Sequence, residues 1–436
     1  MLELIDGRGQ QTPVHISRPR PVGATTSAEE AARAIVSDVR LRGDDALLEY
    51  SAKFDGARLD RADLRVDPDA IAKATSLVRP ELLDALEVMA ERLRRTCEHQ
   101  VPEPWLQEDA DEFVGELVVP LRRIGIYAPG GRAAYPSSVV MAAVPASVAG
   151  VEGLAVATPP GGDGEVPESI LAACAVSGIT EVYRMGGAHA IAALAFGTES
   201  VRPVEKVVGP GNAFVTFAKR SVAGWVGIDS EAGPTEIAVL ADESADHYVI
   251  AVDLIAQAEH GPNGTHVLVT WVPELLERVN GELDRLVATS DRYEDVENAL
   301  IEGGRGVLVR DIDHAVDTVN AFAPEHLQLS CAGARDLLGR IRNAGSVFVG
   351  YDSPVPLGDY GGSTNHVLPS GGTARYASGL GVSDFVKRIY VSGFDRSALE
   401  RLAPHVAALA EAEGLTAHAR AVEARLGNDP FRGLAL

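Results

Sequence analysis

The sequence predicts an α/β protein in which helices cover mostly parallel sheets. From residue 122 onward, short apolar strand-like runs alternate with helical stretches, and turns rich in glycine or proline join them. This alternation is typical of parallel strands connected by crossover helices. The chain has 436 residues, and at about 150 residues per domain that length predicts two or three domains.

Composition and charge narrow the class of protein. Hydrophobic residues make up 46% of the chain and charged residues 23%, as in ordinary globular proteins. The formal net charge of −23 disfavours binding to nucleic acid or to an anionic membrane, because either partner requires a basic surface. The richest apolar run, residues 139–157, is interrupted by proline, glycine and glutamate, so it is a poor membrane-spanning helix. No nucleic-acid or membrane partner is expected.

The cysteines and the N-terminus indicate the compartment. An odd number of cysteines without Cys-x-x-Cys spacing predicts neither a disulfide framework nor a cysteine zinc site. The three are Cys97, Cys174 and Cys331. Residues 1–6 lack the basic start and apolar core of a secretory signal. The sequence therefore predicts a cytoplasmic protein.

The first hundred residues are predicted to be helical. Ser27 and Glu30 match the Ser-x-x-Glu capping box, and apolar residues recur after them at helical spacing. Three helices are expected, at residues 27–53, 67–76 and 80–99. The hydrophobic period then changes to that of a strand at residues 123–127, and a turn at residues 128–131 follows.

Strands and helices alternate through the middle of the chain. Residues 181–185 read as a strand that runs through Gly186–His189 into a helix at 190–196, and such a junction can receive a phosphate. A helix is also expected at residues 168–177. Further strands are predicted at residues 154–158, 206–208, 237–241, 267–270, 307–310 and 347–350. The last stretch, residues 397–425, is rich in Ala, Leu and Glu and predicts a small helical tail.

The usual dinucleotide fingerprint is absent from the sequence. No Gly-x-Gly-x-x-Gly occurs with an acidic residue about twenty positions later. Gly209-Pro210-Gly211 is a weak substitute, since a turn between a strand and a helix needs glycines whether or not it binds phosphate. A nucleotide would have to bind in an unconventional way.

Polar residues next to glycine or proline mark candidate sites. Gln257 and His260 share a face of an apolar helix that Gly261-Pro262 ends, so they form either a metal corner or a helix C-terminus capped by an imidazole. Glu325 and His326 follow Pro324. This second pair is either an exposed polar turn or a proton-transfer pair, because a neutral imidazole can carry protons at pH 7 and a carboxylate can activate water.

A zinc site can be assembled from distant residues. His260, Asp359 and His418 supply an imidazole, a carboxylate and a second imidazole, and Gln257 is an uncommon fourth donor. Spacing alone does not bring these residues together, so the choice stays open on this ground.

Seven motifs occur in a family-specific order. They are Gly209–Val215 (GPGNAFV), Ala232–Glu236 (AGPTE), Gln257–Gly261 (QAEHG), Ala323–Leu327 (APEHL), Gly358–Tyr360 (GDY), Thr364–Pro369 (TNHVLP) and Leu415–His418 (LTAH). In these motifs the sequence resembles histidinol dehydrogenase, from about residue 31 to the C-terminus. A set of seven ordered motifs is far more specific than any one of them.

The resemblance implies an activity and its cofactors. A member of this family oxidises the amino alcohol L-histidinol to L-histidine through the aldehyde and reduces two NAD molecules per turnover. The implied zinc ligands are Gln257, His260, Asp359 and His418 of the partner subunit, and zinc would hold the substrate. Glu325 would activate water, and His326 would take protons from the alcohol and from the aldehyde hydrate.

The resemblance also implies which residues bind substrate and NAD. The substrate-contacting positions are Thr235, His366 and Glu413, together with the zinc ligands and His326. The NAD-contacting positions are Tyr127, His189 and Asn212. Two of these depart from the family pattern, which usually has Gln at the position of His189 and Ser at that of Thr235. The departure at His189 puts the cofactor contacts in doubt more than the change at Thr235, which keeps its hydroxyl.

The implied architecture is an intertwined homodimer of two incomplete Rossmann-like domains with parallel sheets and small terminal segments. Residues 1–23 form an N-terminal arm, residues 24–126 and 236–380 the first domain, and residues 127–235 the NAD-side domain. Residues 381–436 form a helical dimerisation segment, which contributes Glu413 and His418 across subunits. The alternatives are a paralogous zinc- and NAD-dependent alcohol dehydrogenase, a zinc hydrolase that uses Glu325 as its base, and a metal-dependent binding protein.

Overall fold

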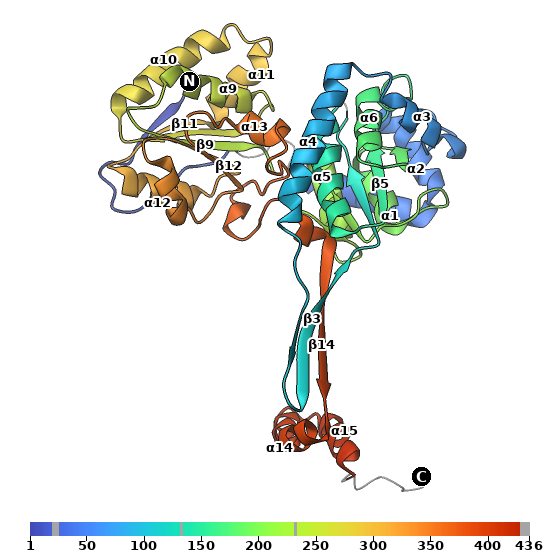
Figure 1. Ribbon diagram of the computed structural model, residues 1–436. Helices are drawn as coiled ribbons and strands as arrows, with labels where there is room; N and C mark the ends of the chain where they lie inside the picture. The colour runs from blue at the N-terminus through green and yellow to red at the C-terminus, as the bar shows by residue number, and fades with distance from the viewer. Residues whose placement is uncertain (20–25, 131–133, 231–232, 428–436) are drawn as a thin grey trace. The chain divides into compact units, whose positions relative to one another are not determined.

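The computed structural model describes residues 1–19, 26–130, 134–230 and 233–427, and the chain divides into two compact units. The first unit comprises Met1–Val101 and Leu121–Phe385, and the second comprises Pro102–Pro120 and Val386–Leu436. The first unit contains two parallel sheets, A and B, each with helices around it (Figure 1). The predicted α/β class with two parallel sheets is confirmed. Gly131 of the predicted turn and Ala232 of the second motif lie outside the described residues.

Sheet A is six-stranded, with the order β1-β11-β10-β9-β12-β13 and parallel pairing throughout. Its strands are β1 (Glu3–Asp6), β9 (Glu236–Ala241), β10 (Thr265–Thr270), β11 (Gly304–Leu308), β12 (His326–Ser330) and β13 (Ser346–Val349). The four inner strands β9, β10, β11 and β12 are buried along their whole length, as expected for strands covered on both faces.

Helices cover both faces of sheet A. Alternate residues of β9 point to opposite faces, so Ile237 and Val239 belong to one core and Ala238 and Leu240 to the other. The first core includes α9 (His247–Ala258), α10 (Pro273–Val287) and α11 (Tyr293–Gly303), and the second includes α12 (Ile312–Phe322). Figure 1 shows these two helical layers on either side of the sheet.

Sheet B is five-stranded, with the order β6-β5-β4-β7-β8 and parallel pairing. Its strands are β4 (Arg123–Tyr127), β5 (Gly153–Thr158), β6 (Val182–Arg184), β7 (Lys206–Val208) and β8 (Gly227–Ile228). One core contains α3 (Pro68–Ala74), α4 (Pro80–Glu98), α5 (Pro136–Ala149) and α6 (Glu168–Val176). The other core contains α1 (Thr26–Arg42), α2 (Asp44–Tyr50), α7 (Gly187–Phe196) and α8 (Ala213–Val222).

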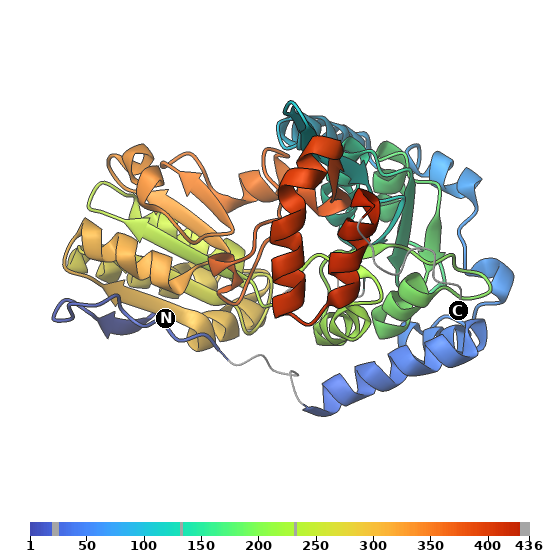
Figure 2. The same ribbon diagram turned by 90° about the horizontal axis from the view of Figure 1, so that it is seen from below.

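The second unit is an antiparallel sheet followed by two helices. The strand order is β14-β3-β2, with β2 (Trp105–Glu108), β3 (Glu112–Pro120) and β14 (Val386–Phe394). The two helices α14 (Arg396–Ala412) and α15 (Thr416–Leu426) lie side by side and form a hairpin (Figure 2). The helical C-terminal tail is therefore present as predicted, whereas its preceding long strand was not anticipated.

The predicted grouping of residues 24–126 with residues 236–380 differs from this arrangement. Strand β4 is the centre of sheet B, where it pairs with β5 and β7, and α1 packs into the same core as α7 and α8. Residues 1–19 belong instead to sheet A, since β1 pairs with β11 and Val14 and Ile16 are buried beneath that sheet. Pairing between strands far apart in sequence decides this grouping, and local patterns do not encode it.

Candidate active site

A pocket of about 480 Å³ lies between the loops of the two sheets in the first unit. It faces the carboxyl ends of β4 and β7 in sheet B and the amino ends of β9 and β12 in sheet A. In sheet B the chain runs outward from β4 to β6 on one side and from β7 to β8 on the other. The ends of β4 and β7 therefore flank a topological switch point, where open α/β sheets usually bind their ligands.

Most of the predicted site residues of the first unit meet at this pocket. The members that line it are Tyr127, Asn212, Thr235, His260, Glu325, His326, Asp359 and His366. Gln257 does not itself line the pocket, but its side-chain amide donates a hydrogen bond to the hydroxyl of Thr235, which does. Glu413 and His418 belong to the second unit, where Glu413 follows α14, His418 lies in α15, and both are exposed.

Glu325 is a largely buried carboxyl group held by two donors. Its Oε2 accepts hydrogen bonds of 2.8 Å from the Thr235 hydroxyl and 2.8 Å from the backbone N–H of Glu236. Burial nevertheless raises the pKa of Glu325 to about 8, because the desolvation of the charged form outweighs both hydrogen bonds. Such a carboxyl changes its protonation state near neutral pH, as a general base requires.

His326 presents one free nitrogen. Its Nδ1 lies 2.8 Å from the backbone carbonyl oxygen of Glu236, so the neutral ring donates its Nδ1 proton there and keeps a lone pair on Nε2. Nε2 is buried and has no hydrogen-bond partner among the described residues; the nearest carboxylate oxygen, Oδ1 of Asp359, is 3.9 Å away. Burial lowers the pKa of His326, which favours this neutral, proton-accepting form.

The candidate metal ligands of the first unit gather beside this pair. Gln257 is near the end of α9, His260 follows that helix, and Asp359 lies in α13 (Val355–Tyr360). Asp359 is largely buried, and this burial raises its pKa. In the described part of the chain, no three His, Cys, Asp or Glu side chains converge to hold a metal ion. One chain thus brings together His260, Asp359 and an amide, and a further ligand would have to come from elsewhere.

His366 lies on the same wall as Asp359. Its Nδ1 is 3.2 Å from the backbone oxygen of Asp359, and burial lowers its pKa to about 4, so the ring is neutral at physiological pH. A neutral imidazole can donate or accept a single hydrogen bond toward a polar ligand in the pocket.

The sheet B side of the pocket is built from a fixed glycine loop. Gly209 has φ 115°, its N–H donates to Asp229 at 2.7 Å, and its carbonyl accepts from Lys219 at 3.0 Å. Lys219 and Asp229 are buried and paired with each other. Asn212 then caps α8 by accepting from the backbone N–H groups of Phe214 and Val215. The loop Gly209–Asn212 is therefore rigid and presents backbone to the pocket.

His189 does not line the pocket. Its side chain is 1% exposed, its Nε2 lies 3.0 Å from Oδ2 of Asp55, and the rings of Tyr50 and Phe54 pack near it. The same Asp55 oxygen accepts from the N–H of Gly186, and the N–H of Gly187 donates to the Tyr127 hydroxyl. The contact with NAD that the resemblance implies for His189 would therefore be indirect, through the glycine turn.

No pattern in the sequence indicated that Asp55 belongs to the site. The helix predicted at residues 27–53 is interrupted at Gly43, where φ is 57°, and it ends in a π-helical turn, Ser51–Asp55, of which Asp55 is the last residue. Single π-turns inside helical segments are often found at functional sites. Arg18 and Glu236, which contact the Glu325 region, were also missed as site residues, although Glu236 belongs to a motif.

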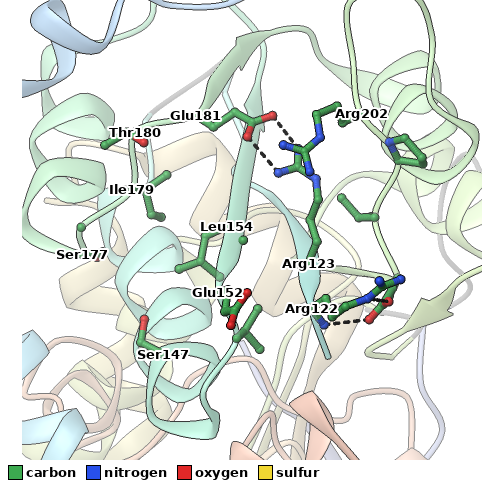
Figure 3. Close-up of a pocket in the computed structure, with 16 residues that line it drawn as sticks. Arg122, Arg123, Ser147, Glu152, Leu154, Ser177, Ile179, Thr180, Glu181 and Arg202 are labelled. Carbon is green, nitrogen blue, oxygen red and sulfur yellow. Dashed lines mark hydrogen bonds and ion pairs between the residues drawn. The ribbon is translucent and has the colours of Figure 1, made fainter. Parts of the chain in front are cut away.

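A second pocket, of about 930 Å³, lies at the opposite ends of the strands of sheet B from the first pocket (Figure 3). It is at the amino ends of the strands, and its two central arginines are already paired: Arg123 with Glu181 and Arg122 with Glu205. None of the seven motifs contributes a described residue to it. The smaller pocket is therefore the candidate active site.

Comparison with known proteins agrees with the sequence motifs. The family model described as histidinol dehydrogenase matches residues 18–426. The chain belongs to the histidinol dehydrogenase family. It is 48% identical over 430 residues to the histidinol dehydrogenase of Thermobifida fusca (strain YX), covering 98% of each chain. It is 45% identical to that of Geobacillus kaustophilus (strain HTA426), covering 92% of this chain and 95% of the relative.

The fold belongs to the same family. The crystal structure of histidinol dehydrogenase from Elizabethkingia anophelis matches with a TM-score of 0.89 and 34% identity, covering 94% of each chain. The predicted family resemblance is thereby confirmed, and the alternative of a paralogous alcohol dehydrogenase is not favoured. None of the described helices is long and apolar enough to cross a membrane.

Proposed function

We propose that this protein oxidises L-histidinol to L-histidine with NAD and zinc. In the first half reaction the primary alcohol loses a hydride and a proton to give the aldehyde, and one NAD+ becomes NADH. In the second, water adds to the aldehyde, and loss of a second hydride and of protons gives the carboxylate and a second NADH. The overall change is a four-electron oxidation that consumes one water and two NAD+.

The free Nε2 of His326 is the observation that carries the proposal. It is a neutral base, buried in a pocket wall, with its tautomer set by the Glu236 carbonyl. His326 accepts the hydroxyl proton of the alcohol at Nε2 as the first hydride leaves the neighbouring carbon. It acts again on the hydroxyl of the hydrate, once the proton from the first step has left.

Glu325 serves the second half reaction. Its Oε2 is 3.4 Å from Nδ1 of His326, so the carboxylate lies against the ring whose Nε2 accepts the proton in the following step. Water activated at this carboxylate adds to the aldehyde beside that ring. The thiols are not needed as nucleophiles, which is consistent with their setting: all three cysteines are buried and free, and burial raises their pKa values. Free cysteines also suit the proposed cytoplasmic location.

The residues of the first unit can supply part of the ligand set of a zinc ion. An imidazole, a carboxylate and an amide oxygen are acceptable zinc donors. The Asp359 side chain is largely buried, and its one ion-pair contact within the described residues is with Nε2 of His326 at 3.9 Å, so a cation would compensate its charge. Gln257, His260, Asp359 and His418 of the partner subunit would hold the metal. Bound zinc would orient the alcohol and polarise its oxygen.

The sheet B side fits the cofactor. The pocket at the switch point is lined on this side by Tyr127, Pro210, Gly211 and Asn212. Bound NAD+ would accept the hydride in each half reaction. The side chain of Asn212 already accepts hydrogen bonds from two backbone N–H groups at the start of α8. A phosphate of the cofactor would therefore bind to the backbone of the glycine loop and to the remaining N–H group of the helix.

Three residues determine substrate selection in this proposal: Thr235, His366 and Glu413. The Thr235 hydroxyl donates to Glu325 and accepts from Gln257, so it positions both the base and a ligand. The neutral ring of His366 faces the substrate imidazole as a single hydrogen-bonding partner. Glu413 supplies a carboxylate for the substrate's cationic group, and it does so from the partner subunit in this proposal.

A homodimer is supported by the surface of the second unit. Its sheet and helices expose many large apolar side chains, which a three-stranded sheet cannot bury alone. They are Trp105, Leu106, Phe113, Val114, Leu117, Ile389, Tyr390, Phe394, Val406, Leu409 and Leu415. Glu413 and His418 are exposed in the same unit and so are available to another chain.

The test is an assay of the purified protein with histidinol and NAD+, followed by NADH absorbance and product analysis. Two NADH per histidine are expected, with loss of activity on chelation and recovery on adding zinc. If no NADH forms from histidinol when zinc is present, the proposed function fails.

A further inference from the structure

One backbone segment of β9 holds both members of the Glu325–His326 pair. The N–H of Glu236 donates to Glu325 at 2.8 Å, and the carbonyl of Glu236 accepts from Nδ1 of His326 at 2.8 Å. A shift of this one residue would therefore move the base that activates water and would also free the His326 ring to turn.

The side chain of Glu236 is anchored by the N-terminal segment. It is 2% exposed, and both of its oxygens accept hydrogen bonds from the guanidinium of Arg18, from Nε and at 3.2 Å from Nη2. A paired guanidinium and carboxylate of this kind fixes orientation as well as position. Arg18 therefore sets the place of the residue whose backbone holds the pair.

Arg18 also contacts the segment that leads from α12 into Glu325. Its Nη2 donates to the carbonyl of Phe322 at 2.6 Å and to that of Ala323 at 3.4 Å, and its guanidinium lies 4.0 Å from the centroid of the Phe322 ring. Ala323 ends α12 in a left-handed conformation, φ 54° and ψ 65°, which a residue with a Cβ adopts at a cost. Pro324 and Glu325 follow at once, so this turn sets the direction in which Glu325 leaves the helix.

The rest of the N-terminal segment is anchored independently of Arg18. Strand β1 is paired with β11, and Val14 and Ile16 are buried in the core beneath sheet A. Loss of the guanidinium alone should therefore leave the segment docked.

We propose that Arg18 is a positioning residue for the reaction: by joining Glu236 to the end of α12 it holds Glu325 and His326 in register with each other. The proposal rests on the roles of Glu325 and His326 proposed above. Arg18 does not line the pocket, and it acts only through the groups that it holds.

The experiment compares Arg18→Met and Arg18→Lys with Arg375→Met in the full-length, zinc-loaded protein. Arg375 is a matched control, since it is exposed and donates to the Ala321 carbonyl at 3.2 Å, at the same end of α12. Steady-state kcat and KM are measured from the alcohol and from the aldehyde, together with zinc content and Tm.

Arg18→Met should lower kcat by about 10- to 100-fold, because small misplacements of reacting groups have effects of this size. Its KM for NAD and its zinc content should stay within about twofold of wild type, since neither site involves the guanidinium. Arg18→Lys should also lose kcat, because an ammonium cannot bridge a carboxylate and two carbonyls as a planar fork does. Arg375→Met should keep the wild-type kcat.

Wild-type kcat in either Arg18 variant, even with a lower Tm, would show a purely structural role and overturn the proposal. If Arg18→Met does not fold, Arg18→Lys decides the question. A second check is Glu236→Gln: its loss and that of Arg18→Met should not add in the double variant, because both act on one contact, and full additivity would count against the proposal. Inactivity of the wild-type protein with histidinol, or full activity of Glu325→Gln and His326→Ala, would instead contradict the proposed function.

Discussion

Glu325 and His326 are neighbours in sequence, with 3.4 Å between Oε2 and Nδ1, and burial shifts their pKa values in opposite directions. The pKa of Glu325 rises to about 8 and that of His326 falls below its ordinary value, in each case because desolvation disfavours the charged form. At pH 7 both side chains are therefore mostly neutral. His326 is ready to accept a proton at that pH, whereas Glu325 becomes a base only as it ionises.

The first prediction concerns His326. His326→Ala should lower kcat by about 100-fold or more, the usual range for loss of a general base, while zinc content stays at the wild-type level. The measurement is kcat alongside metal analysis. His314→Ala is the control, because His314 is also a buried histidine of the first unit but does not line the pocket and bonds to the backbone of Thr12 and of Arg310. Loss of zinc from His326→Ala would show that His326 is a ligand instead.

The second prediction concerns pH. Oxidation of the aldehyde should become faster as pH rises toward about 8, because the Glu325 carboxylate is protonated below that pH and cannot activate water. Glu325→Gln should slow this half reaction and abolish the rising limb. The pH dependence of single-turnover rates, started from the aldehyde, measures both effects. An unchanged limb in Glu325→Gln would assign the titration to another group.

The same pKa shift has a consequence for stability. The folded-state pKa of Glu325 lies above its ordinary value, so the folded state binds this proton more tightly than the unfolded state does. The stability that the neutral carboxyl provides is present below about pH 4.5 and is lost as pH rises through about 8. The Tm of Glu325→Gln should therefore exceed that of wild type by more at pH 9 than at pH 6.

The third prediction concerns the Asp55–His189 contact. Asp55→Ala should raise the KM for NAD by about fivefold or more and lower the stability by about 1–3 kcal/mol, because His189 and the Gly186 N–H lose their buried partner. His189→Gln should change the KM for NAD by less, since the ring does not face the pocket. Asp45→Ala, at an exposed carboxylate on α2, is the control. An unchanged KM in Asp55→Ala would separate the glycine turn from cofactor binding.

Much of the fold and of the candidate site was predictable from the sequence. The strand, turn and helix alternation predicted the α/β class because each parallel strand carries its own crossover helix. The end of α9 beside Gln257 and His260 was predictable because Gly261, with φ 105°, and Pro262 are local stop signals. The motif residues at the pocket were identified through the family resemblance, since no spacing rule brings Glu325 near Thr235.

The remaining features depend on contacts that local patterns do not contain. Arg18 meets Glu236 across more than two hundred residues, and nothing around Arg18 distinguishes it from a surface arginine. Asp55 reaches His189 only because a π-turn ends the helical segment. The membership of β4 in sheet B depends on pairing with β5 and β7, and for that reason the predicted boundary at residue 126 separated it from its own sheet.

The fourth prediction tests the crossed subunits. His418→Ala and His326→Ala should each be nearly inactive, the first through loss of a zinc ligand and the second through loss of the base. When the two are mixed, dissociated and reassociated, a mixed dimer has one intact site, formed by the His326 of one chain and the His418 of the other. Random pairing should restore about a quarter of the wild-type activity, since half of the dimers are mixed and each has one of two sites. If His418 acts within its own chain, every site in the mixture lacks a residue and no activity returns.

Mixing His418→Ala with Glu413→Ala is the control, because both residues would come from the same subunit. A mixed dimer then has one site without the zinc ligand and one site without the carboxylate, so no activity should be recovered.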